Sequence, residues 1–99
     1  MKPTELVLGA LLGCIGVDFT NILAKQRQAV TSVSAEASSE QDPQPPWSFR
    51  RIEVVFRVGG DNLDQRAVER ALALAAERYC AVGATLAGCV EITHRAIVC

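Results

Sequence analysis

Two cysteines are the residues of this chain best suited to chemistry. Cys14 ends the run ELVLGALLGC and Cys80 lies within ERYCAVGATL, so both have apolar, helix-forming neighbours. A cysteine thiolate is a nucleophile, and two thiols that meet can pass from a sulfenic acid to a disulfide. Cys89, at the start of an expected strand, and Cys99, the last residue, are interpreted as structural or incidental. The first question is therefore whether Cys14 and Cys80 meet.

Local chemistry leaves two interpretations open for each of these thiols. Cys14 can be a small buried hydrophobe, because apolar surroundings raise the pKa of a thiol and make it inert. Cys80 stands where one helix is expected to end and a short helical turn to begin. A helix N-terminus with Arg78 nearby can lower the pKa of a thiol there, although a capping or core cysteine would occupy the same place. Sequence context alone favours reactivity mainly at Cys80.

Composition narrows the class of protein. The 99 residues predict a single domain over residues 1–99, and a domain of this size gains much from oligomerisation. The sequence is 49% apolar but only 5% aromatic, and ten basic against eleven acidic residues give a net charge of −1. That balance argues against nucleic acid or an anionic membrane as the main partner. Four cysteines and a single histidine without a CxxC motif predict no metal site, and reduced thiols favour a cytoplasmic chain.

The N-terminal segment offers a rival interpretation. The run LLGC ending at Cys14 resembles a lipoprotein cleavage box. Against it, Glu5 interrupts a very short basic start, and the apolar helical pattern continues beyond Cys14. Asp18 stops the apolar run well short of the ~20 residues of a membrane span. We therefore expect no membrane partner and keep the lipoprotein as a third alternative.

The first element that must position a thiol is a long helix over residues 4–25. Thr4 is its expected cap, Glu5 suits its positive end, and Lys25 and Arg27 suit its negative end. Its glycines, Gly9, Gly13 and Gly16, share one side and each costs about 1 kcal/mol in helix propensity. Close approach of another backbone would compensate, either from a second subunit or from the chain's own sheet.

The rest of the chain alternates between strand and helix patterns. Residues 28–37 predict an edge strand, 38–48 a proline-bearing loop, and 52–58 a half-buried strand that ends at Gly59 and Gly60. A helix capped by Asp61 or Asn62 follows, and its apolar face comprises Val68, Ala71, Leu72, Ala75 and Tyr79. A short helical turn through residues 84–86, a turn at Gly88 and a strand from residue 90 complete the chain. The order helix, strand, strand, helix, strand predicts an α+β domain.

Three segments resemble the OsmC/Ohr family: residues 3–23 (PTELVLGALLGCIGVDFTNIL), 49–56 (FRRIEVVF) and 66–86 (RAVERALALAAERYCAVGATL). The similarity runs over residues 3–98 and lies closer to the OsmC-like branch than to the organic hydroperoxide resistance branch. It implies two main helices packed on an antiparallel sheet, in an intertwined homodimer. It also implies a cysteine-based peroxidase, with chemistry like that of peroxiredoxins, acting on organic hydroperoxides or hydrogen peroxide.

The resemblance also assigns roles. Cys14 would be the peroxidatic thiolate, Cys80 the resolving thiol, and Glu5, nine positions before Cys14, lies near the family's activating carboxylate. A thiol or dithiol reductant would reset the pair, and no metal or organic cofactor is required. We therefore predict catalytic roles for all three residues.

One departure from the family pattern shapes the alternative. Family members carry strands before the first helix, with an arginine that activates the peroxidatic cysteine, and this chain begins where that region should end. We expect an N-terminally shortened member, in which Arg50, Arg51 or Arg57 would be the arginines available to Cys14. The alternative is a non-catalytic dimeric module of the same fold that binds a small hydrophobic ligand.

Overall fold

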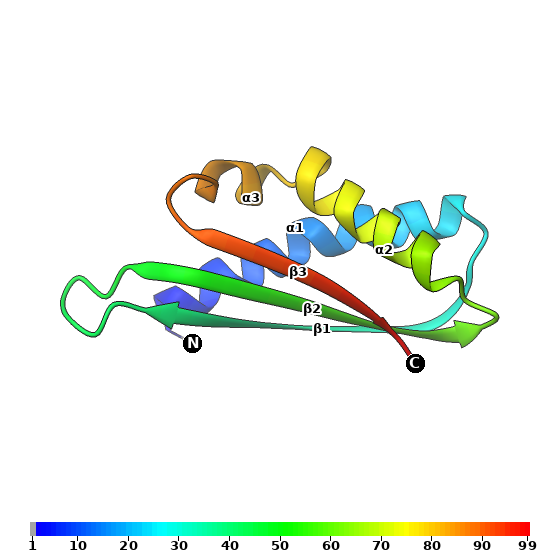
Figure 1. The fold of residues 1–99 in the computed structure, drawn as a ribbon, viewed down its shortest axis with the longest axis horizontal. Helices are drawn as coiled ribbons and strands as arrows, with labels where there is room; N and C mark the ends of the chain where they lie inside the picture. Colours follow the sequence, from blue (N-terminus) through cyan, green and yellow to red (C-terminus); the bar gives the residue numbers. More distant parts are fainter. Residues whose placement is uncertain (1) are drawn as a thin grey trace.

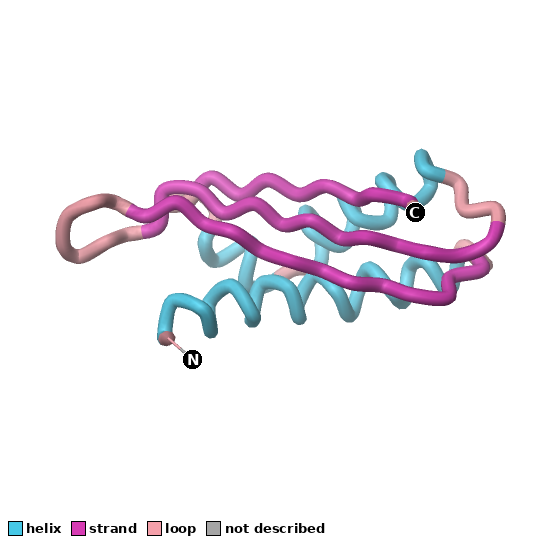
Figure 2. Tube along the Cα trace, turned by 90° about the horizontal axis from the view of Figure 1, so that it is seen from below, coloured by secondary structure: helices cyan, strands magenta, loops and turns pink. Residues whose placement is uncertain are grey.

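All helices lie on one face of a three-stranded sheet (Figures 1 and 2). The computed structural model describes residues 2–99, in a body of 47 × 22 × 20 Å. The elements are α1 (Pro3–Lys25), β1 (Ala29–Gln41), β2 (Phe49–Asp61), α2 (Gln65–Leu74), the π-helical turn η1 (Ala75–Tyr79), α3 (Ala81–Leu86) and β3 (Glu91–Val98). This order agrees with the predicted α+β domain.

The sheet is mixed. Its strand order is β1-β2-β3, and β1 pairs with β2 in the antiparallel sense that the sequence analysis expected. β3 instead pairs with β2 in parallel, with Arg51 opposite Glu91 and Val58 opposite Val98. Parallel neighbours need a crossover connection, and the segment from α2 to α3 supplies it across the helical face. The last strand therefore departs from the expected antiparallel pairing.

The core lies between α1, α2 and the middle strand. Four residues of α1 spaced four apart face the sheet and are fully buried: Leu11, Ile15, Phe19 and Leu23. β2 buries alternate residues against them: Ile52, Val54, Phe56 and Val58. The rings of Phe19 and Phe56 meet edge to face with centroids 5.1 Å apart, a favoured arrangement for aromatic pairs. This packing fixes α1, and with it Cys14, over the centre of the sheet.

Two helix caps differ from the expected ones. α1 begins at Pro3, whose fixed φ suits the first helical position, and Thr4 lies inside the helix rather than at its cap. α2 is capped by Asp64, which accepts a 3.0 Å hydrogen bond from the backbone N–H of Arg66. Asp61 and Asn62 do not cap it, because β2 extends to Asp61 and Asn62 turns the chain with a φ of +52°.

The glycine pair lies within β2 instead of ending it. Gly60 pairs with Val30 where β1 has an irregular register, and a Cβ on Gly60 would stand 2.1 Å from the carbonyl oxygen of Ala29. Only glycine permits so close an approach of two backbones. The β1–β2 hairpin is longer than predicted at both ends, and at the end away from these glycines its loop is confined to residues 42–48.

A π-helical turn interrupts the second helix. The predicted apolar face is buried through Ala75, but Tyr79 is 55% exposed and does not join it. A π-turn inserts an extra residue into the helical repeat, so the side chains after it face a different direction. The same shift precedes Cys80, which is buried. π-turns are frequent at functional sites.

The length and composition of α1 would suit a membrane span. The helix has 23 residues and a mean hydropathy of 1.9, so the expectation that Asp18 makes the apolar run too short is wrong by that measure. Core helices of soluble proteins share these properties. Leu11 and Phe19 are completely buried against the sheet, whereas 22% of the apolar window of α1 as a whole is buried.

Candidate functional site

Cys14 and Cys80 meet where the middle of α1 faces the start of α3. Cys14 is half-buried and lies between the core residues Leu11 and Ile15 on its helix. The Cys80 side chain and the backbone N–H groups of Val82 and Ala81 lie close enough to the Cys14 thiol to lower its pKa. The structure thus brings together the two thiols that the sequence analysis singled out. Both are free in the reduced state.

Cys80 has a second task, because its sulfur caps α3. The residue has extended backbone angles between η1 and α3, and its Sγ accepts a 3.2 Å hydrogen bond from the backbone N–H of Gly83. A Cβ on Gly83 would stand 3.3 Å from that sulfur, closer than a comfortable contact. Gly83 therefore leaves the sulfur room to lie directly over the first turn of α3.

The surroundings shift the two thiols in opposite directions. The backbone N–H of Val82, followed by the Cys80 side chain, lowers the pKa of Cys14 against the smaller opposing effects of burial and of Asp18. Burial is the main cause that raises the pKa of Cys80, and the neighbouring Cys14 adds to it. These pKa directions favour Cys14 as the thiol that ionises first, opposite to the expectation from local pattern. Arg78, expected to activate Cys80, is exposed.

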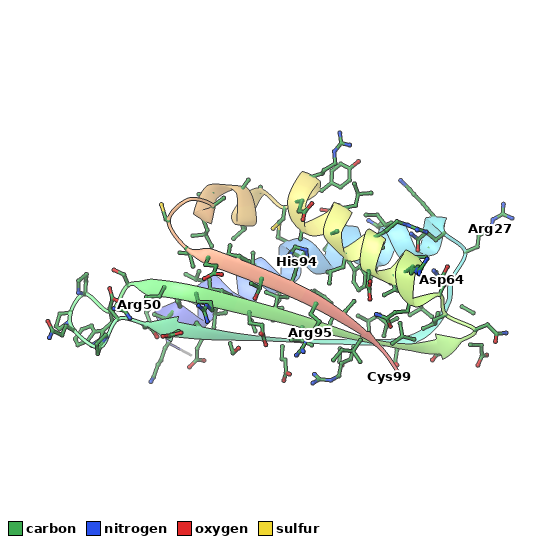
Figure 3. The ribbon with its side chains drawn as sticks, in the orientation of Figure 1. Arg27, Arg50, Asp64, His94, Arg95 and Cys99 are labelled. Carbon is green, nitrogen blue, oxygen red and sulfur yellow. The ribbon has the colours of Figure 1, made fainter. Side chains whose placement is uncertain are left out.

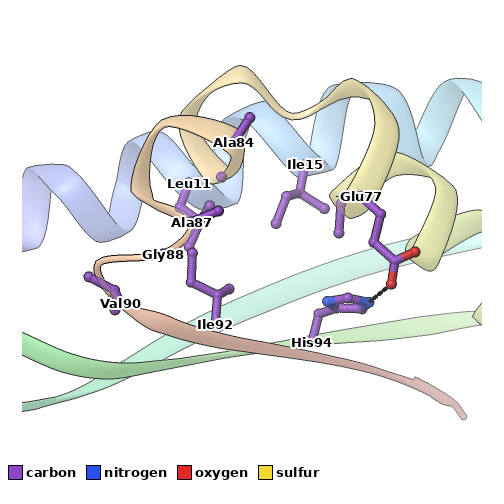
Figure 4. A pocket seen from close by; sticks show the side chains of 11 residues that line it. Leu11, Ile15, Glu77, Ala84, Ala87, Gly88, Val90, Ile92 and His94 are labelled. Atoms are coloured by element: carbon purple, nitrogen blue, oxygen red, sulfur yellow. Dashed lines mark ion pairs between the residues drawn. The ribbon is translucent and has the colours of Figure 1, made fainter.

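A largely aliphatic cavity of about 420 Å³ opens near the middle of α1 (Figure 4), and neither Cys14 nor Cys80 is among the residues that line it. α1, the end of the second helix, α3 and β3 surround it. Its lining comprises Leu11, Ile15, Ala76, Glu77, Gly83, Ala84, Ala87, Gly88, Val90, Ile92 and His94. The polar groups are Glu77 and His94, whose Oε1 and Nε2 atoms lie 3.9 Å apart. The cavity can accept a small apolar molecule next to the residues that flank Cys14.

Glu5 lies away from the thiols in this chain. It is exposed in the first turn of α1, nine positions before Cys14. Nine residues of α-helix amount to about 13 Å along the axis and about half a turn around it, so the two side chains leave opposite sides of the helix. Its catalytic role remains a prediction from the resemblance.

The three candidate arginines lie in ion pairs away from Cys14. Arg51 and Arg57 alternate with the buried residues of β2 and so lie on the face opposite the helices. There Arg51 contacts Glu91 at 3.2 Å and Arg57 contacts Glu36 at 3.0 Å. Arg50 pairs with Asp42 beside the hairpin loop. Figure 3 shows the same division on β3, where His94 lies toward the helices and Arg95 toward the opposite face. Within residues 2–99, the groups that lower the pKa of Cys14 are backbone amides and a thiol.

The three glycines on one side of α1 have different surroundings, so neither the chain's own sheet nor a second subunit accounts for all of them. A Cβ on Gly16 would make ordinary contact with the Phe56 ring at 3.7 Å, so this glycine packs on the chain's own sheet. Gly9 and Gly13 have open space beside them. Near them Leu6 and Val17 are 58% and 63% exposed, which leaves an apolar strip on the outer face of α1.

Among the described residues, the other two cysteines, Cys89 and Cys99, do not take part in a metal site. Cys89 is exposed in the turn after α3, and Cys99 is exposed at the end of β3 (Figure 3). In the part of the chain that the structure describes, no three His, Cys, Asp or Glu side chains gather as metal ligands would.

The sequence analysis expected a short helical turn after Cys80, but it did not predict that this turn acts on Cys14. The backbone N–H groups of Val82 and Ala81 lower the pKa of Cys14, and no side-chain motif predicts this effect. The usable signal was the spacing from Cys80 to Gly83, since an N-cap side chain bonds the amide three residues on.

Comparison with known proteins agrees with this architecture. The family model described as OsmC-like protein matches residues 1–95. Protein YhfA of Escherichia coli K12 is 41% identical over 93 residues, which cover 94% of this chain and 69% of that protein. A solved hypothetical protein of Aquifex aeolicus superposes with a TM-score of 0.92 at 28% identity, over 100% of this chain and 74% of that one.

A more distant relative shares the fold. The structure of an organic hydroperoxide resistance protein OsmC of Legionella pneumophila superposes with a TM-score of 0.72 at 18% identity, over 98% of this chain and 69% of that one. The family match covers nearly the whole chain and includes both cysteine-bearing segments. The resemblance inferred from the sequence is thereby confirmed, and the chain belongs to the OsmC-like family.

Proposed function

We propose that this chain is a thiol-dependent peroxidase that reduces organic hydroperoxides or hydrogen peroxide through Cys14 and Cys80. The proposal is supported by two neighbouring thiols that influence each other's pKa, with the pKa lowered at Cys14 and raised at Cys80. The two thiols of such a pair take different roles, because Cys14 ionises first and attacks the peroxide while Cys80 keeps its proton. Membership of the OsmC-like family supports a redox function related to peroxides.

The chemistry proceeds in three balanced steps. The Cys14 thiolate attacks the outer oxygen of the hydroperoxide, the O–O bond breaks, and the alkoxide takes a proton and leaves as an alcohol. Cys14 is then a sulfenic acid. The Cys80 sulfur attacks the sulfenic sulfur, the S–O bond breaks, and water leaves as the disulfide forms. A thiol or dithiol reductant then supplies two electrons and two protons to restore both thiols.

The first step prepares the second one. The pKa of Cys80 is raised first by burial, and the hydrogen bond and charge of Cys14 raise it further. Conversion of the Cys14 thiolate to an uncharged sulfenic acid removes that charge. Cys80 therefore becomes easier to ionise just when it must act as the nucleophile.

The apolar cavity supports an organic substrate. It adjoins Leu11 and Ile15, which flank Cys14, and aliphatic side chains dominate its lining. Burial of an alkyl or aryl group there would favour binding by about 25 cal/mol for each Å² of apolar surface removed from water. This supports organic hydroperoxides as better substrates than hydrogen peroxide.

The protein is proposed to act as a cytoplasmic homodimer. Leu6, Ala10, Gly13 and Val17 follow one another at helical spacing on the outer face of α1 and are all exposed. An apolar strip on that face is unusual for a monomer and suits an interface between two copies. A reducing compartment would keep the cysteine pair supplied with thiol reductants.

Anaerobic stopped-flow mixing with cumene hydroperoxide, followed by thiol counting, tests the proposal. We expect the parent to lose two thiols per peroxide and Cys14→Ser to lose neither. Cys80→Ser should lose one and accumulate a sulfenic acid that dimedone traps. Cys99→Ser is the matched control and should behave as the parent, because Cys99 is exposed at the end of the sheet. If Cys14→Ser consumes peroxide as fast as the parent, the assignment is wrong.

A second candidate function is a non-catalytic module of the same fold that binds a small hydrophobic ligand. The cavity of about 420 Å³ is the observation that favours it. On this alternative, the parent would bind an apolar fluorescent probe without consuming peroxide, and Cys14→Ser would bind it equally well. Peroxide-dependent loss of two thiols would exclude it.

A further inference from the structure

The short helix α3 depends strongly on its cap. It spans six residues, and none of their side chains is fully buried. A helix of that length has little stability of its own, because nucleation costs more than one or two turns return. The Cys80 sulfur satisfies the N–H of Gly83 at 3.2 Å, and the Cys80 carbonyl accepts from Ala84 at 2.9 Å. Cys80 therefore holds the first turn of α3 with both its side chain and its backbone.

The same short helix forms a wall of the apolar cavity. Figure 4 shows Ala84, Ala87 and Gly88 across the cavity from Ile92 of β3, with Leu11 of α1 behind them. The chain then turns at Gly88 with a φ of +88° and reaches β3. A change in α3 must therefore change the shape of the cavity.

We propose that the redox state of Cys80 controls the folding of α3 and thereby opens or closes this wall of the cavity. The proposal rests on the peroxidase function, in which a hydroperoxide oxidises Cys14 and the Cys14–Cys80 disulfide forms with loss of water. Reduction of that disulfide by a thiol restores the cap and closes the wall again.

The physical basis is that the Cys80 sulfur cannot both cap α3 and bond to the Cys14 sulfur without changing its position. In the reduced protein, the Cys80 sulfur lies over the first turn of α3 and accepts from Gly83. In a disulfide the same sulfur is bonded covalently to the Cys14 sulfur, so it is drawn away from α3 toward α1. The N–H of Gly83 is then left with a poorer acceptor, and oxidation thus weakens the cap of the helix that forms the cavity wall.

This coupling would link release of the alcohol product to formation of the disulfide. While the pair is reduced, α3 is capped and the cavity holds the apolar part of the hydroperoxide. Once the disulfide has formed, the wall loosens and the alcohol leaves. The reduced protein then binds the substrate, and the protein with the disulfide releases the product.

Amide hydrogen exchange measured by NMR tests the coupling. The readout is exchange at Ala84 and Ala87, whose N–H groups donate to Cys80 and Gly83 at 2.9 Å each. We expect about fivefold faster exchange after oxidation, the factor by which an ordinary N-cap stabilises a helix. The amide of Val68, which bonds Asp64 at 2.9 Å in α2, is the internal control and should not change. Unchanged exchange at Ala84 and Ala87 in the oxidised protein would overturn the proposal.

Three variants separate the cap from the disulfide. Cys80→Ala should exchange about fivefold faster without any oxidant, since it lacks the capping acceptor. Cys80→Ser keeps an acceptor at the same place and should resemble the reduced parent with or without oxidant. Cys14→Ser keeps the cap and should not respond to oxidant. If Cys80→Ala does not fold, the results for Cys14→Ser and Cys80→Ser still show whether loosening of α3 requires the disulfide.

The oxidant distinguishes failure of this proposal from failure of the peroxidase function. Oxidation is carried out with cumene hydroperoxide and, separately, with diamide, which forms disulfides without peroxide chemistry. If diamide loosens α3 and cumene hydroperoxide does not react, the coupling stands and the peroxidase function fails. If peptide mapping finds no Cys14–Cys80 disulfide with diamide, or finds it with α3 unchanged, the coupling itself fails.

Discussion

Gly16→Ala should stabilise the protein, because the structure leaves room for a methyl group at a position where glycine is costly. Gly16 lies in the interior of α1, the helix that carries Cys14. Alanine is more favourable than glycine in a helix interior by about 1 kcal/mol. The added Cβ would stand 3.7 Å from Cε1 and 4.0 Å from Cζ of Phe56, which is ordinary van der Waals contact.

The two contributions have the same sign. A fully buried methylene contributes about 0.8 kcal/mol, and a half-buried one about half of that. Together with helix propensity, Gly16→Ala should raise the free energy of unfolding by about 1 to 1.5 kcal/mol. For a domain of this size, that corresponds to a rise in Tm of at least about 4 °C. The hydrogen bond from Thr20 to the Gly16 carbonyl, at 2.9 Å, involves only backbone at residue 16 and should persist.

Equilibrium urea denaturation, with the m-value as a check, measures this change. Gly60→Ala is the opposing control, because its Cβ would meet the Ala29 carbonyl oxygen at 2.1 Å and should destabilise the hairpin strongly. A stability gain for Gly16→Ala with an unchanged m-value supports the packing of α1 on β2. A loss of stability at every protein concentration would refute the reasoning, because it would mean that α1 lies closer to Phe56 than the structure places it.

Four further outcomes are expected. The rate of Cys14 alkylation by iodoacetamide should stay high as the pH falls below the pKa of an ordinary thiol. It should drop only below the lowered pKa of Cys14, and Cys80→Ala should move that midpoint upward by removing a hydrogen bond to the thiolate. Asp64→Ala should cost about 1 kcal/mol in urea denaturation through loss of the α2 cap, whereas Asp64→Ser should cost little. Glu5→Gln tests the catalytic role that the resemblance predicts: because Glu5 is exposed and lies away from Cys14 within one chain, the Cys14 midpoint should stay unchanged, and a shift would support the predicted role. Val17→Glu should shift the protein toward monomer in sedimentation velocity if the outer face of α1 is the interface.

The elements that periodicity predicts well are those with one uninterrupted apolar pattern. The helix over residues 4–25 and the strand around Phe56 lie where expected, because each buries one face against the other. The parallel pairing of β3 was missed, since it depends on where the crossover returns the chain and not on the strand's own residues. The cap at Asp64 was missed because β2 extends past the glycine pair.

The structure brings together the two cysteines that the resemblance to a family singled out, Cys14 and Cys80. Local pattern favoured ionisation at Cys80, whereas the pKa directions favour Cys14. That order depends on which sulfur is more buried and which one faces the amides of α3. The π-turn of η1, which shifts the helical phase just before Cys80, is a tertiary feature that a 3.6-residue period cannot reveal.

Within residues 2–99, the groups that lower the pKa of Cys14 are backbone N–H groups of α3 and the Cys80 side chain. The N–H of Val82 is the largest cause of the lowered pKa, and Val82 lies in the first turn of α3. That turn is capped by the sulfur of Cys80, the same atom that the proposed disulfide takes up. On the coupling proposed above, the oxidised protein loses its peroxidatic thiolate and also the amide arrangement that stabilises it. Reduction of the disulfide must then refold α3 before Cys14 recovers its low pKa, so thiolate recovery should follow α3 protection rather than thiol release.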